Sequence, residues 1–180
     1  MAARNSPAQF GWVTRLLHWL MALGMIFMIG FGLILARMQP SLDTLWLYGL
    51  HKSIGICLLA LVLLRILWHR ISPPPAPLGD QAWQLRAAHL GHALLYILML
   101  AVPLVGWIAS SASGISTVIF GTITLPRIAP VSTEVDHLFF TLHSWLNYLL
   151  IGVLTLHVAA ALMHELVQRD GTLRRMLRGA

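Results

Sequence analysis

The stretch HSWLNYLLIGVLTLHVAAALMH, residues 143–164, decides the fold class of this chain. It contains no Asp, Glu, Lys or Arg, and a bilayer core roughly 30 Å thick is crossed by a helix of about 20 apolar residues. His143 and His157 are 14 residues apart, which corresponds to about 21 Å and almost four helical turns. They therefore share one helix face at opposite depths, and His164 continues that face. The stretch predicts a membrane-spanning helix with imidazoles near both membrane surfaces.

The composition of the whole chain supports an integral membrane protein. Only 10% of the 180 residues are charged and 58% are hydrophobic, whereas a soluble domain carries about 25% charged residues. The net charge of +6 comes from twelve basic residues without a contiguous run, a pattern that does not favour nucleic-acid binding. The single cysteine, Cys57, excludes an intrachain disulfide. The length favours one bundle over two large domains.

Apolar segments predict four membrane-spanning helices. We expect them at residues 12–36, 47–69, 87–110 and 138–168. The second is the weakest, because Lys52 and Arg65 lie near its ends, but long basic side chains can extend to the interface. Inside a bilayer every backbone polar group needs a partner, so helices are favoured over open strands. The chain is therefore predicted to be an all-α, integral membrane four-helix bundle, with one domain over residues 1–180.

The connections between these helices are polar or rich in turn-forming residues. Residues 72–77, SPPPAP, cannot continue a helix. Residues 111–137 form the longest connection, and connections of this length usually have a function. We expect it to lie on the membrane surface and to shape an entrance there.

The distribution of basic residues predicts the orientation in the membrane. If both termini are cytoplasmic, nine basic residues lie inside and three outside. The nine are Arg4, Arg15, Arg65, Arg70, Arg86, Arg169, Arg174, Arg175 and Arg178, and the three are Arg37, Lys52 and Arg127. Both termini are therefore expected in the cytoplasm.

Nine histidines in so apolar a chain call for a function, because polar groups within a bilayer are costly. Imidazole is a usual axial ligand of haem iron. A helix with two histidines on one face, four turns apart, suits two stacked haems, one near each surface. At the outer depth His143 is matched by His51. At the inner depth the partner of His157 is His18, His89 or His92, and spacing leaves these three open. His69 and His137 are interpreted as solvated residues at loop edges.

Other residues at matching depths suit the same cofactor. Basic side chains can pair with haem propionates, and the candidates are Arg15, Arg86 and Lys52. Small residues that admit a flat macrocycle are Gly24, Gly55 and Gly152.

These motifs resemble the bacterial cytochrome b561 family of small four-helix dihaem membrane proteins, over nearly the whole chain. The residues that carry the resemblance are Arg15 with His18-Trp19, His51 with Gly55, His89-Leu90-Gly91-His92 followed by Tyr96, Pro103 and Gly106, then His143, Leu156-His157, His164 and Asp170–Met176. The resemblance implies that His18 and His157 bind the inner haem iron and that His51 and His143 bind the outer one. It also implies a bacterial inner membrane location and electron exchange with membrane ubiquinone.

The family resembled here includes a branch that oxidises superoxide at the outer face. The resemblance therefore predicts a dihaem b-type cytochrome that transfers electrons between a donor at the outer face and membrane ubiquinone. Lys52 and Arg127 are expected to attract a small anion such as superoxide, and His164, His89 and His92 to contact quinone. Whether the chain is a superoxide:quinone oxidoreductase or a plain electron-transfer protein stays open, as does a homo-oligomer. One alternative is a cytochrome subunit that docks a dehydrogenase or hydrogenase. Another is a transition-metal transporter, which would need carboxylates and histidines at mid-membrane, where this chain has almost none.

Overall fold

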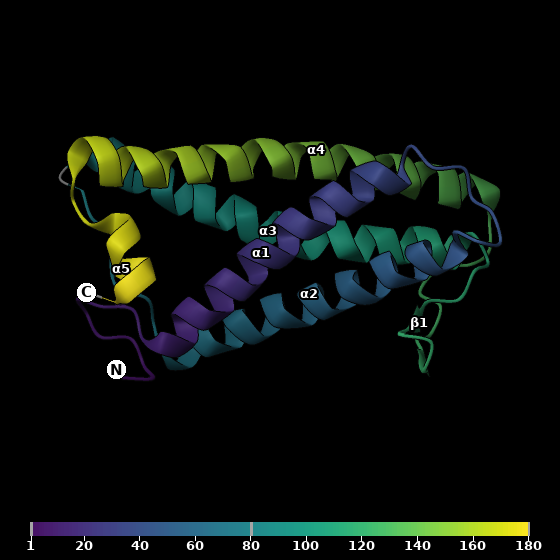
Figure 1. The fold of residues 1–180 in the computed structure, drawn as a ribbon, viewed down its shortest axis with the longest axis horizontal. Coiled ribbons are helices and arrows are strands. Elements are labelled where there is room, and N and C mark those ends of the chain that lie inside the picture. The colour runs from purple at the N-terminus through teal and green to yellow at the C-terminus, as the bar shows by residue number, and fades with distance from the viewer. Residues whose placement is uncertain (1, 80, 180) are drawn as a thin grey trace.

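A computed structural model describes residues 2–79 and 81–179, so Met1, Asp80 and Ala180 of the expected 1–180 domain lie outside the described residues. Figure 1 shows long helices aligned along one axis. The elements are α1 (Trp12–Leu35), α2 (Leu45–Ile71), α3 (Ala82–Ala112), β1 (Val118–Ile119), β2 (Ile123–Thr124), α4 (Thr133–Met163), the π-helical turn η1 (His164–Gln168) and α5 (Thr172–Arg178). Within these described residues, four helices are long and apolar enough to cross a membrane, with α4 and η1 counted as one. The expected all-α membrane bundle is confirmed.

The helices α3 and α4 each begin five residues before the expected start. The added residues include polar ones that an apolar window leaves out, such as Arg86 in α3 and Glu134 and Asp136 in α4. In α4 the Ser132 hydroxyl caps the helix by accepting from the Val135 backbone N–H at 3.3 Å. Acidic residues in a first turn also suit the helix dipole. Hydropathy thus finds the bilayer-crossing part of a helix and misses its extension into the polar interface.

The packing of the bundle is built on two helix pairs. The helix α4 packs against α3, and α1 packs against α2, which also contacts α3. Leu95 and Leu98 of α3 and Leu150 of α4 form a buried cluster between the first pair. Many large apolar side chains face outward instead, such as Leu23 at 65% and Leu156 at 72% exposure. An apolar exterior of this kind suits lipid rather than water.

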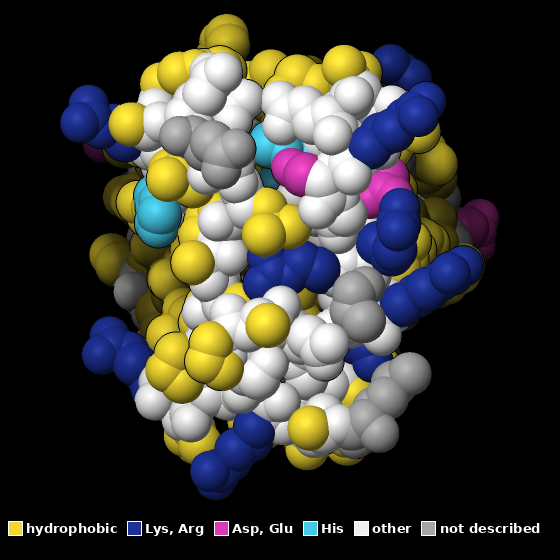
Figure 2. Space-filling model, turned by 90° about the vertical axis from the view of Figure 1, so that its left-hand side faces the viewer, with side chains coloured by type: hydrophobic (Ala, Val, Ile, Leu, Met, Phe, Trp, Pro, Cys, Tyr) yellow, Lys and Arg dark blue, Asp and Glu magenta, His cyan; other side chains and the backbone are white. Residues whose placement is uncertain are grey.

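The two ends of the bundle differ in what covers them. Both chain ends, α5 and the connection from α2 to α3 lie at one end, and the connection from α3 to α4 lies at the other (Figure 1). Lys and Arg side chains surround the first of these ends, and few acidic side chains are visible there (Figure 2). The nine basic residues predicted from the sequence to be cytoplasmic lie on the two terminal segments, at the ends of helices beside them and near the connection from α2 to α3. The fold gathers these segments at one end of the bundle (Figure 1).

The long connection contains a short hairpin that the sequence reasoning missed. Val118 pairs with Thr124 and Ile119 with Ile123 in antiparallel register. The turn between the strands uses Phe120 and Gly121, both with positive φ. The Ser53 hydroxyl of α2 accepts from the Phe120 N–H at 2.9 Å. These contacts place the hairpin against the end of α2.

Candidate functional site

Two histidines expected at the outer depth face each other across the bundle. His51 lies on α2 and His143 on α4, and their ring centroids are 6.4 Å apart with an interplanar angle of 80°. They come from segments separated by 92 positions (143 minus 51). Only the packing of the helices brings them together.

The orientation of the His143 ring is fixed by a backbone carbonyl of α3. Its Nδ1 lies 2.9 Å from the Val102 oxygen. A carbonyl oxygen can only accept, so Nδ1 must carry the hydrogen, and Nε2 keeps its lone pair. This is the arrangement in which a histidine binds a metal through Nε2 while its other nitrogen is held by a second group.

The rings of His143 and His51 lie close to two glycines, Gly106 and Gly32, whose lack of a side chain leaves space for them. A Cβ added at Gly106 would lie 3.0 Å from two His143 ring atoms, and one at Gly32 would lie 3.3 Å from His51 Cε1. The glycines chosen from sequence behave differently. An added Cβ at Gly152 meets nothing within 4 Å and one at Gly55 meets only Met28 at 3.8 Å, while Gly24 packs against Leu58. The sequence reasoning missed Gly32, whose signal is its depth opposite His51.

The outer pair borders a cavity of about 900 Å³ between the long helices. Its wall is mainly apolar, with Met21, Met25 and Met28 from α1 and Leu150 from α4. Small-molecule and cofactor sites have volumes of this order and a similar balance of apolar walls and few polar groups. The cavity can therefore accept a large flat apolar group beside His51 and His143.

Lys52, the neighbour of His51, also borders this cavity. Its Nζ donates to the Ser110 hydroxyl and to the Ser116 carbonyl, each at 3.2 Å. Arg127, the other cation expected at this end, is exposed on the connection between α3 and α4. The structure thus places one cation beside the outer pair and leaves the second at the surface.

The inner histidines form a denser group around His157. The ring of His18 lies 6.3 Å from that of His157, and the ring of His92 lies 5.5 Å from it. His89 is exposed, and its Nδ1 contacts the Leu85 carbonyl of its own helix at 2.6 Å. Of the three inner partners left open by spacing, the structure brings His18 and His92 to His157 but not His89.

Arg65 and two further side chains of α2 and α3 lie beside this group. Arg65 Nη1 is 3.2 Å from His18 Nδ1, and its guanidinium carbon is 5.9 Å from the centre of the Tyr96 ring. The Tyr96 hydroxyl is 3.1 Å from His69 Nδ1. His69 is thus not the solvated loop-edge residue expected, because α2 continues to Ile71 and carries it into the bundle. Its 18-residue spacing from His51, five helical turns, was the signal that both share one face.

Two other cations, Arg15 and Arg86, were expected to pair with haem propionates, and both lie at the end of the bundle that holds the termini. Arg15 Nη1 donates to the Leu177 carbonyl of α5 at 3.0 Å. Arg86 is exposed near the start of α3. His137 is exposed on α4, as expected.

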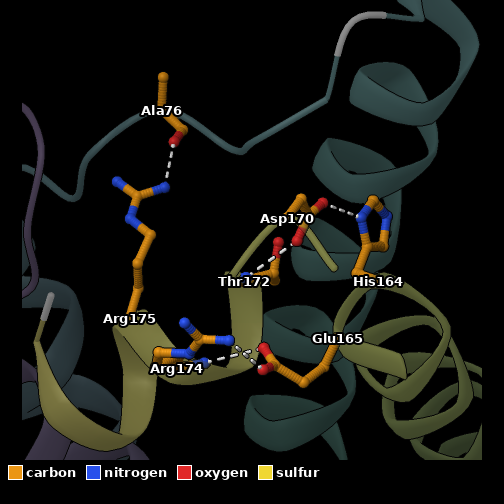
Figure 3. Close-up of polar contacts among 7 residues, drawn as sticks. All are labelled: Ala76, His164, Glu165, Asp170, Thr172, Arg174 and Arg175. Carbon is orange, nitrogen blue, oxygen red and sulfur yellow. Dashed lines mark hydrogen bonds and ion pairs between the residues drawn. The ribbon is translucent and has the colours of Figure 1, made fainter. Parts of the chain in front are cut away.

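His164 is paired with an acidic residue that follows it in the chain. Figure 3 shows its ring directed at Asp170, with Nδ1 2.5 Å from Oδ2. The other carboxylate oxygen accepts from the Thr172 N–H at 2.9 Å. Burial raises the pKa of Asp170, but the hydrogen bonds from His164 and Thr172 outweigh it and hold that pKa below its ordinary value. No hydrogen bond joins His164 to His89 or His92 within residues 2–79 and 81–179.

The residues present fit a haem at each histidine pair. The ring separations of 6.4 Å for His51–His143 and 6.3 Å for His18–His157 are nearly equal. Each gap admits one metal ion between two imidazoles, since a metal–nitrogen bond to histidine is about 2 Å long. Within the part of the chain that the structure describes, no group of three or more His, Cys, Asp or Glu is arranged to hold a metal ion. Two imidazoles across such a gap suit a metal whose other ligands come from a macrocycle.

One family model and several curated relatives are similar to this chain over most of its length. The family model described as prokaryotic cytochrome b561 matches residues 9–179. Cytochrome b561 homolog 2 of Escherichia coli K12 is 35% identical over 182 aligned positions, covering 98% of this chain and 95% of the relative. Cytochrome b561 homolog 1 of the same organism is 38% identical, covering 71% of the chain and 72% of the relative. A probable superoxide oxidase CybB of Yersinia pestis is 30% identical, covering 89% and 91%.

Proposed function

The chain belongs to the prokaryotic cytochrome b561 family, and from this premise we propose that it is a dihaem cytochrome passing electrons from an outer donor to membrane ubiquinone. Family membership makes it a multi-pass, b-type membrane cytochrome of electron transfer. The observation that carries the dihaem proposal is the pair of facing imidazoles at each end of α4, His143 with His51 and His157 with His18.

The chain supplies ligands, orientation and a dry site. Haem iron, when bound, supplies one-electron oxidation and reduction. The four histidines would hold the iron, and the Val102 carbonyl keeps His143 in the ligating tautomer. Methionine and leucine side chains make the wall around the outer pair apolar. Together these groups favour electron transfer between fixed sites rather than binding of a substrate to the iron.

Quinone is proposed to react at the inner end, with His164 as the main contact and His89 and His92 as further candidates. Asp170 fixes Nδ1 of His164 as the hydrogen-bearing nitrogen, which leaves Nε2 for a ligand. Reduction of a quinone consumes two electrons and two protons, so an imidazole at the interface is a suitable proton carrier. We expect His164→Ala to slow ubiquinone reduction several-fold with haem content unchanged. The exposed His137 provides the control, and unchanged kinetics in all three inner variants would remove this site.

The outer donor is proposed to be superoxide. Lys52 lies beside His51 and at the cavity, and a relative covering most of the chain is named a probable superoxide oxidase. A cation at the entrance steers an anion by long-range attraction, which salt screens. We expect Lys52→Gln to lower the rate of haem reduction by superoxide and to flatten its dependence on ionic strength, whereas Arg37→Gln changes neither. A salt-independent rate in the unaltered protein would contradict steering.

A second candidate function is docking of a dehydrogenase or hydrogenase. The connection from α3 to α4 exposes Ile115, Phe120 and Ile123, at 57–60%, and exposed apolar side chains of this kind suit a protein partner. If superoxide fails to reduce the haems while a membrane extract containing an oxidisable dehydrogenase substrate does so, the docking function replaces the superoxide function.

The membrane is proposed to be the bacterial inner membrane, with both termini in the cytoplasm. The basic side chains around the end that holds the termini support this orientation (Figure 2). Reporter fusions after Pro77 and Gly179 should report the cytoplasm, and a fusion at Thr122 should report the periplasm. A periplasmic signal from the fusion at Gly179 would reverse the orientation.

A further inference from the structure

Arg65 is a cation in a membrane-spanning helix that has no carboxylate partner within residues 2–79 and 81–179. It lies in α2, six residues before the helix ends at Ile71. Its Nε is shielded from solvent and has no hydrogen-bond partner. The two ion pairs of the described chain are His164–Asp170 and Glu165–Arg174. A guanidinium in a membrane-spanning helix is costly unless an anion or another polar group meets it.

The contact that Arg65 makes with His18 conflicts with the proposed role of His18. Arg65 Nη1 lies 3.2 Å from His18 Nδ1, and a guanidinium has only donors. Nδ1 must therefore accept, which leaves the hydrogen on Nε2. If His18 binds iron through Nε2, that hydrogen moves to Nδ1, and two donors then face each other. Ligation by His18 thus requires Arg65 to find another acceptor.

Tyr96 and His69 supply further polar atoms at the same place. The Arg65 guanidinium lies over the Tyr96 ring, and the Tyr96 hydroxyl contacts His69 Nδ1 at 3.1 Å. His69 Nε2 is also buried without a hydrogen-bond partner. If Nδ1 of His69 donates to the Tyr96 oxygen, the Tyr96 hydrogen is free for an acceptor such as a carboxylate oxygen. The orphaned Nε of Arg65 and the Tyr96 hydroxyl in that arrangement are both donors, which indicates a missing acceptor at this place.

We propose that Arg65 and Tyr96, positioned by His69, form an anion subsite that holds a propionate carboxylate of the haem between His18 and His157. The inference rests on the proposed function, because it needs a haem at the inner pair. Guanidinium–carboxylate pairing is strong and directional, and the subsite resolves both the unpaired charge and the conflict at His18. The two cations expected from the sequence at the inner haem are less suited to bind this propionate, because Arg15 donates to the Leu177 carbonyl in α5 and Arg86 is exposed.

The test follows the carboxylate itself in the haem-loaded protein. Cells supplied with labelled precursor make haem with carbon-13 in its propionate carboxyls. Infrared difference spectra between the oxidised and reduced protein then identify carboxylate bands that shift with the label. We expect Arg65→Lys and Tyr96→Phe to move a label-sensitive band, the first by more than the second. Arg70→Gln, an exposed arginine on the same helix, should leave every band in place.

The outcomes separate this inference from the function on which it rests. Unchanged label-sensitive bands in both Arg65→Lys and Tyr96→Phe, with haem retained, would overturn the subsite. Bands that move but carry no label would also overturn it, because the anion would then not be a propionate. If one variant loses the inner haem, the band shift of the other variant decides the test. Loss of the inner haem from both variants, with the outer haem retained, contradicts a role limited to one propionate. The proposed function fails by a different result, namely absence of haem from the purified, unaltered protein.

Discussion

The outer and inner histidine pairs have almost the same ring separation but are held in different ways. At the outer pair a backbone carbonyl fixes His143, two glycines make room for the rings, and apolar side chains line a large cavity. At the inner pair His157 faces two imidazoles, and an arginine contacts one of them. The outer geometry is therefore set by the backbone, whereas the inner geometry depends on side chains that can rearrange. This difference predicts that the two sites respond differently to substitution.

Removing one ligand from each pair has the largest expected effect. His143→Ala should eliminate the outer haem and His157→Ala the inner one, so that each variant keeps half of the haem and one set of low-spin bands. Haem quantification against protein, with visible spectra, measures this. The exposed His137→Ala should keep full haem content. Complete loss of haem from both ligand variants would show that the two sites are not independent.

Comparison of His18 with His92 sharpens the inner assignment. Both rings lie near His157, but the His18–His157 separation matches that of the outer pair. We expect His18→Ala to abolish the low-spin inner haem and His92→Ala to retain it with a small spectral shift. If the two variants behave in the opposite way, His92 is the ligand and the subsite at Arg65 loses its premise.

A methyl group at Gly106 tests whether the backbone sets the outer site. The Cβ of Gly106→Ala would lie 3.0 Å from the His143 ring and displace it from the Val102 carbonyl. Loss of such an outer-shell contact typically costs about 10- to 100-fold in metal affinity. Haem retention during dilution in detergent should fall accordingly at the outer site alone. Gly152→Ala, where the added Cβ meets nothing within 4 Å, should retain haem fully, and equal retention in the two variants would contradict the account.

The smallest effect is expected at the pair His164–Asp170. Asp170→Asn removes the negative charge that strengthens this hydrogen bond, a contribution of about 1 kcal/mol at a partly exposed site, which corresponds to roughly fivefold faster amide exchange in α5. The pKa of Asp170 is lowered in the folded protein, so its contribution is complete above the ordinary value of about 3.9 and is lost as the pH falls through the lowered pKa. The difference from the unaltered protein should therefore decrease as the pH falls through that lowered pKa. Asp43→Asn, in the connection between α1 and α2, is the control.

Much of the fold could be read from the sequence, because a bilayer-crossing helix is a local property of about 20 consecutive residues. The end of the first helix was predicted to within one residue, Ala36 against Leu35. The hairpin at 118–124 was not predicted, since its strands are only two residues long and its contacts with Ser53 are distant in sequence. Hydropathy predicts neither strands this short nor contacts between residues so far apart in the sequence.

The candidate site was predicted in the same uneven way. Spacing on one helix relates His143 to His157, and depth selects His51 as a partner. Spacing did not separate His18 from His92, because both lie at one depth on different helices, and packing alone sets their distances to His157. The cluster of Arg65, Tyr96 and His69 was missed because its members lie on two helices and gain meaning only from their contacts. A helix-wheel comparison of His51 with His69 would have shown part of it.

The central claim, two haems each held by two histidines, is tested most directly by haem stoichiometry in the purified, unaltered protein. Haem is extracted and quantified per chain, and the reduced-minus-oxidised spectrum and electron paramagnetic resonance report the type and coordination of the iron. The account predicts two b-type haems per chain, both six-coordinate and low-spin. One haem per chain, or a high-spin signal from either iron, would contradict it.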